Sequence, residues 1–130
     1  MNWEKVKNIF KECKELLGNP DVELVHPEKW LEITDTPIED DTVGMSSDYF
    51  KIITVVYGEL SSSEIREVTF HEIAHILYPN KKHWWVECFA SKIAKTRNWF
   101  CYHAEKYGHS KKELPKRERL IEMARECVER

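Results

Sequence analysis

Apolar side chains recur at intervals of three or four residues near the N-terminus. Between residues 2 and 17 they are Trp3, Val6, Ile9, Phe10, Cys13, Leu16 and Leu17. This spacing predicts an amphipathic helix, and Gly18-Asn19-Pro20 predicts its end.

Short apolar runs and turn-forming residues follow this helix. Residues 22–33 predict a short strand, a break at a proline, and a short extended or helical piece. Residues 34–48 are rich in acids and turn formers, which predicts a surface loop. Residues 49–57 are mostly β-branched or aromatic and predict the strongest strand of the chain.

The second half of the chain predicts three helices. Ser61 and Glu64 form a capping-box pattern at the start of the first, which runs over 62–77 before Pro79-Asn80. A long helix is expected over 83–107, and a strongly charged one over about 115–129. The inward face of the long helix is expected to carry Val86, Ala90, Ile93, Ala94 and Trp99.

The length and charge of the chain exclude several classes of protein. A chain of 130 residues fits one domain, here 1–130, with 108–130 as a possible C-terminal regulatory or packing segment. The net charge of −3 argues against nucleic-acid binding, since the C-terminal lysines and arginines are interleaved with glutamates. No apolar run approaches the roughly 20 residues that span a membrane, and the N-terminus lacks an apolar signal region. We therefore expect a cytoplasmic protein whose four cysteines are reduced thiols.

The helix over 62–77 contains the sequence His-Glu-Ile-Ala-His at 71–75. Histidines four residues apart project from one helix face, so His71 and His75 can bind one metal ion. Glu72 lies about 100° around the helix, where it can orient a metal-bound water and accept its proton. The pattern predicts a site for one Zn²⁺ per chain, although cobalt and other divalent ions suit the same ligands.

A catalytic zinc site needs a third protein ligand and one open position. The downstream candidates are His83, Glu87, His103 and Glu105. Glu87 is favoured because it lies in the first turns of the next helix, after a tight reversal; the alternative is a solvated glutamate near a helix N-terminus. His83 is the rival, although a tri-histidine site of the Met-turn type would require Gly and His where the chain has Tyr78 and Lys81.

The segments HEIAH (71–75) and ECFAS (87–91) resemble the gluzincin branch of the zincin metallopeptidases, and most closely the minigluzincins. The resemblance implies an α+β, zincin-like single domain. It would have a small mixed sheet, an active-site helix, a glutamate helix, and N- and C-terminal helices. It also implies that His71, His75 and Glu87 bind zinc, that Glu72 is the general base, and that Ser91 stands where larger gluzincins have an aspartate that orients a zinc ligand.

The resemblance extends to the substrate and to regulation. It implies that an extended peptide pairs with a sheet edge, for which 49–57 is the candidate unless that run is a buried central strand. It also implies a latent form in which 108–130 blocks the cleft, the alternative being a helix that only packs on the domain.

We therefore expect a zinc-dependent metalloendopeptidase that acts on peptide or protein substrates. Tyr102 and His103 are possible transition-state stabilisers, together with Tyr78, His83, Tyr107 and His109. Two alternatives stay open: a regulatory zincin module of the repressor-cleaving type, and a zinc-stabilised binding module without turnover.

Overall fold

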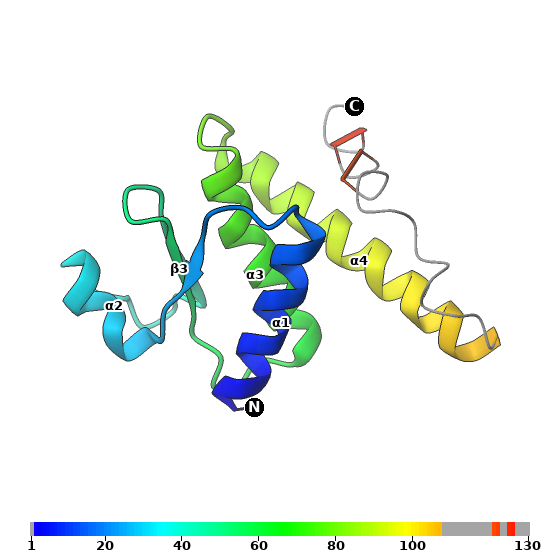
Figure 1. The fold of residues 1–130 in the computed structure, drawn as a ribbon, viewed down its shortest axis with the longest axis horizontal. Helices are drawn as coiled ribbons and strands as arrows, with labels where there is room; N and C mark the ends of the chain where they lie inside the picture. The colour runs from blue at the N-terminus through cyan, green and yellow to red at the C-terminus, as the bar shows by residue number, and fades with distance from the viewer. Residues whose placement is uncertain (1, 108–120, 123–124, 127–130) are drawn as a thin grey trace.

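The computed structural model describes residues 2–107, 121–122 and 125–126, and for 96–107 it describes the backbone only. The elements in chain order are α1 (Trp3–Leu16), β1 (Glu23–Leu24), α2 (Pro27–Thr34), β2 (Gly44–Ser47), β3 (Ile52–Val55), α3 (Ser62–Leu77) and α4 (His83–Tyr107). In this described part, four helices and a three-stranded mixed sheet form a small α+β domain (Figure 1). The predicted α+β class is confirmed.

The sheet has the order β1-β3-β2, with β1 parallel and β2 antiparallel to β3. All four residues of β3 are buried, so its apolar run marks a central strand covered on both faces. The prediction of 49–57 as the edge strand is therefore wrong, and its alternative, a buried central strand, is correct. The edge strands are β1 and β2, and β2 lies within a stretch that we expected to be a surface loop.

The loop prediction failed because β2 has the sequence GMSS and carries almost none of the usual strand signals. Its pairing depends on main-chain hydrogen bonds to β3, in the register Gly44 to Val55 through Ser47 to Ile52. Within the described residues, the outer edge of β2 pairs with no other strand.

Helix boundaries agree closely with the capping signals. The Ser61 side chain accepts a hydrogen bond from the Glu64 N–H at 3.2 Å, and the Glu64 carboxylate accepts one from the Ser61 N–H at 3.1 Å. This reciprocal capping box starts α3 where the sequence predicts it. At the end of α1, Gly18 and Asn19 adopt positive φ angles of 97° and 53°, which turn the chain away from the helix.

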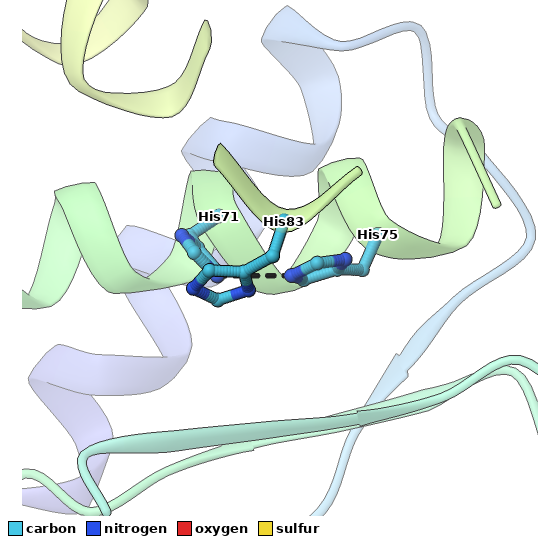
Figure 2. A group of neighbouring side chains, drawn as sticks. All are labelled: His71, His75 and His83. Carbon is cyan, nitrogen blue, oxygen red and sulfur yellow. Dashed lines mark hydrogen bonds between the residues drawn. The ribbon is translucent and has the colours of Figure 1, made fainter. Parts of the chain in front are cut away.

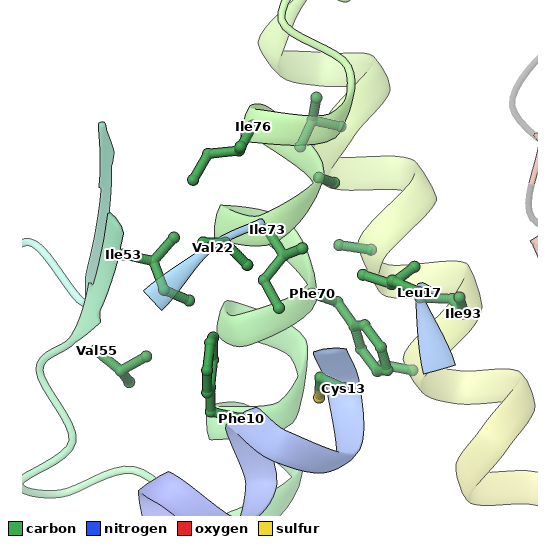
Figure 3. Packing of buried hydrophobic residues seen from close by; sticks show 14 of the residues in the cluster. Phe10, Cys13, Leu17, Val22, Ile53, Val55, Phe70, Ile73, Ile76 and Ile93 are labelled. Atoms are coloured by element: carbon green, nitrogen blue, oxygen red, sulfur yellow. The ribbon is translucent and has the colours of Figure 1, made fainter. Parts of the chain in front are cut away.

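Helix α3 lies at the centre of the domain (Figure 1), where it contacts α1, α4, β2 and β3. Its buried side chains share one hydrophobic core with the sheet and with α1, as Figure 3 shows. Its fully buried members include Phe70, Ile73, Ile53, Phe89 and Ile93. Burying each such side chain contributes on the order of 1.5–3 kcal/mol, so α3 is held on several sides.

Helix α4 packs along α3 through the inward face that the sequence predicts. Val86, Ala90, Ile93 and Ala94 are buried, whereas the side chain of Trp99 lies outside the described residues. None of the described helices is long and apolar enough to cross a membrane.

The predicted helix over 115–129 lies mostly outside the described residues. Of that stretch, 121–122 and 125–126 are described and are helical. Ile121 packs against the core, and the Arg125 guanidinium donates a hydrogen bond of 2.6 Å to the Tyr78 hydroxyl. The described part of this segment therefore contacts the C-terminal end of α3.

Candidate metal centre

Two histidines of α3 face the same side of the helix, one turn apart. The Nε2 atoms of His71 and His75 lie 3.0 Å apart, and a hydrogen bond joins them when one ring carries the proton (Figure 2). Two nitrogens that bind one tetrahedral zinc ion at about 2.0–2.1 Å would lie about 3.3 Å apart. The separation that α3 imposes is therefore close to the one that zinc requires.

A third histidine, His83, joins them from the first residue of α4. Its ring centroid lies 4.8 Å from that of His71 and 5.2 Å from that of His75. One ligand atom from each of the three rings lies within 4.8 Å of the others, a distance that a single metal ion can bridge with a small side-chain movement. Figure 2 shows the three rings converging from the two helices.

The turn between α3 and α4 explains why His83 reaches this place. The Tyr78 N–H donates to the Ala74 carbonyl at the end of α3, and the Lys81 N–H donates to the Tyr78 carbonyl in the next turn. This reversal is tight, so the start of α4 lies beside the last turn of α3. The Met-turn spacing does not describe it. His83 is an exposed surface residue, and its ring nevertheless lies next to the rings of His71 and His75.

The imidazoles of His71 and His75 suit a metal ion in their protonation state as well. Burial, and then the neighbouring His75 and His83, lower the pKa of His71 to about 4. Burial and His83 also lower the pKa of His75. Both rings are therefore neutral at pH 7, which is the form that binds zinc.

Glu72 lies directly beside the histidines and is almost completely buried. Its Oε1 is 3.7 Å from His71 Nε2, and only 7% of the residue is exposed. Burial raises the pKa of its carboxyl to about 7, against a hydrogen bond with Ser46 that lowers it. A carboxyl with such a pKa can take up and release a proton near neutral pH.

Gly44 lets the edge strand approach this carboxyl closely. A Cβ atom at position 44 would lie 2.6 Å from Val68 Cγ1 and 3.0 Å from Glu72 Cγ. Any side chain there would push β2 away from α3 or displace Glu72. Neither Gly44 nor Ser46 was predicted as a site residue, because the polar sequence of β2 does not indicate a strand.

A cleft of about 580 Å³ opens over these groups. The segment 41–44 forms one wall, a face of α3 forms another, and His83 and Glu87 of α4 border it. His71 and Glu72 line the same cleft, so a molecule within it can reach the histidine cluster.

Glu87, the third ligand that the sequence favoured, lines this cleft without joining the histidine cluster. Its Oε2 lies 4.0 Å from His83 Nε2, one helical turn away, and its side chain is largely exposed. Among the described residues, the group within bridging distance of one ion is His71, His75 and His83. The ligand role of Glu87 stays a prediction.

The other predicted site residues lie apart from the cluster or outside the described side chains. Ser91 is half-buried on α4, and in the described part of the chain it makes no hydrogen bond to His71. Tyr78 packs against Trp85 and Phe89 and receives the Arg125 hydrogen bond. For Tyr102 and His103 the structure describes only helical backbone, so their predicted role is untested.

The described cysteines, Cys13 and Cys88, are free thiols. Cys13 is buried in the core, and burial raises the pKa of its thiol to about 12, which suppresses the nucleophilic thiolate. This agrees with the expectation of reduced cysteines for these two positions.

A scan against protein-family models, a search of curated proteins and a search of solved structures each found no match to this chain. The function is therefore inferred from the geometry of the site and from the motif resemblance.

Proposed function

We propose that this protein is a zinc-dependent metallopeptidase with a zincin-like active site. The observation that carries the proposal is the convergence of His71, His75 and His83 at an open cleft, with Glu72 buried beside them. Three protein ligands leave one position of a tetrahedral ion for water, which is the arrangement of catalytic rather than structural zinc. The motif resemblance to gluzincins supports the same reaction.

Helix α4 offers two candidates for the third ligand, His83 and Glu87. The geometry favours His83, whose ring already meets the other two. Glu87 is the ligand that the gluzincin resemblance implies. We propose His83, with Glu87 next to it as an acceptor that can orient its ring.

A bound zinc ion would supply a water of pKa near 7 and would polarise the carbonyl of the bond to be cleaved. Glu72 is placed to accept the proton of that water and then to deliver it to the leaving amine. Its burial excludes bulk water from the proton-transfer path, and Ser46 holds the carboxyl in place. The unpaired edge of β2 borders the cleft, where an extended peptide can add as a further strand.

The proposal is tested by comparing zinc-reconstituted wild type with Glu72→Gln on an unfolded protein substrate. We expect wild type to produce new peptide ends, and we expect Glu72→Gln to retain zinc while its rate falls by at least about a hundredfold. Glu15→Gln, an exposed change on α1, is the matched control and should cleave like wild type. Equal rates for wild type and Glu72→Gln would refute the assignment of the base.

Stoichiometric zinc without any cleavage would favour the zinc-stabilised binding module instead. Because the resemblance implies latency, the same assay should include wild type shortened before residue 108. Activity that appears only after this truncation would support 108–130 as the blocking segment.

A further inference from the structure

One face of α3 runs along the cleft for two turns beyond the histidines. Glu64, Glu67 and Val68 precede His71 and Glu72 at the three- and four-residue spacing of a single helical stripe, and all five line the cleft. At 1.5 Å of rise per residue, Glu67 lies about 6 Å and Glu64 about 10 Å from His71 along the helix axis. The cleft therefore continues from the metal centre past two carboxylates.

The charged side chains that line this part of the cleft are all acidic. Asp41, on the loop before β2, faces the same space as Glu64 and Glu67, and the described lining includes no lysine or arginine. Arg66, which lies between them in sequence, reaches instead toward Glu12 at 3.7 Å. A zinc ion would offset the negative charge of the carboxylates nearest to it, Glu72 and Glu87. The negative charges of Asp41, Glu64 and Glu67 would remain.

Glu64 is fixed in both position and charge. Its carboxylate accepts the hydrogen bond from the Ser61 backbone, and this contact and the Ser61 side chain lower its pKa. The capping box thus holds a carboxylate at the far end of the cleft as part of the helix start. Glu67 follows three residues later on the same stripe.

We infer that this cleft selects peptides with a lysine or arginine two or three residues from the bond to be cleaved, on one side of that bond, where Glu67 and Glu64 receive the cation. An extended peptide advances about 3.3 Å per residue, so residues two and three positions away lie about 6.6 and 10 Å from the cleaved bond. These distances match the positions of Glu67 and Glu64. The inference rests on the proposed peptidase function and specifies its substrate class.

The test uses zinc-loaded protein and a set of labelled octapeptides that differ only in where one lysine replaces norleucine. Binding is measured by fluorescence anisotropy with the Glu72→Gln variant, which is expected not to cleave the probe, and cleavage is measured with wild type. At one or two positions on one side of the bond, we expect lysine to improve binding by about threefold to fivefold for each carboxylate that it meets. The preference should weaken as salt is raised.

Matched variants assign the preference to particular carboxylates. Glu67→Gln and Glu64→Gln should each reduce the lysine-to-norleucine ratio, whereas Glu15→Gln should leave it unchanged. Glutamine still supports a capping box, so Glu64→Gln keeps the start of α3 intact.

The outcomes separate the two claims. Binding or cleavage without a preference for lysine, a preference on both sides of the bond, or one that survives both glutamine substitutions would overturn this inference alone. Zinc-loaded protein that binds and cleaves none of the peptides would overturn the proposed function, and this inference with it.

Discussion

Burial of the Glu72 carboxyl should make the metal-free protein less stable at neutral pH than a variant without that charge. Glu72→Gln replaces the carboxyl by an amide of nearly the same shape, in a position that is 7% exposed. The amide cannot ionise, so the variant avoids the cost of burying a negative charge without a bound cation beside it.

The magnitude follows from the pKa of about 7 in the folded protein, against a reference value of 4.5. Below pH 4.5 the carboxyl is protonated in both folded and unfolded chains, and the full stability is present. As pH rises from 4.5 to 7, the unfolded chain releases its proton first, and the free energy of unfolding falls by about 1.4 kcal/mol per pH unit. Above pH 7 the loss levels off at about 3 kcal/mol.

The pH dependence can be checked by measuring the free energy of unfolding in urea, with EDTA present, at several pH values. We expect Glu72→Gln to be more stable than wild type by up to about 3 kcal/mol at pH 8, and the difference to vanish near pH 4. The lowered pKa of His71 makes the free energy of unfolding rise with pH, which is the opposite trend. This contribution is common to both proteins and cancels in the comparison. A difference that does not change with pH, or a variant less stable than wild type at pH 8, would refute the reasoning.

Three further predictions concern the frame around the site. Gly44→Ala should destabilise the protein by about 1–3 kcal/mol and slow cleavage, because the added Cβ would clash with Val68 and Glu72. Gly58→Ala is the control and should do neither, because nothing lies within 4 Å of its added Cβ. Equal thermal stability of the two variants would contradict this. Ser61→Ala should cost about 1 kcal/mol by removing the cap of α3, a loss that denaturant titration can measure and that an unchanged midpoint would exclude. Zinc at about a hundred times its dissociation constant should raise wild-type stability by about 2.7 kcal/mol, and the absence of any change in melting temperature between zinc and EDTA would argue against a specific site.

The helices were predictable because their signals are local. The bounds of α3 and the start of α4 agree with those expected from Ser61, Glu64 and Pro79, and the spacing of His71, Glu72 and His75 puts all three on one helix without reference to any tertiary contact. The histidine pair is thus a property of the helical repeat itself.

The parts that failed depend on contacts between distant segments. Strand β2 owes its existence to main-chain pairing with β3 and to the absence of a side chain at Gly44, and neither shows in its polar sequence. Likewise, His83 joins the cluster because of how the turn after Tyr78 directs α4, which spacing alone does not reveal. Its approach is a tertiary feature, whereas Glu87 was favoured for its place in the first turns of the helix after the reversal, and the resemblance implies the same ligand role.

Zinc affinity, measured side by side for wild type, His83→Ala and Glu87→Ala with a competing chelator, tests the proposed metal centre most directly. We predict about one zinc per chain in wild type and a loss of zinc affinity of more than a hundredfold in His83→Ala. The loss in Glu87→Ala should not exceed about a hundredfold, as expected when only a group that orients a ligand is removed. A greater loss in Glu87→Ala than in His83→Ala would replace the tri-histidine centre by the gluzincin ligand set. A wild type that binds no zinc would contradict the metal centre and the enzyme built on it.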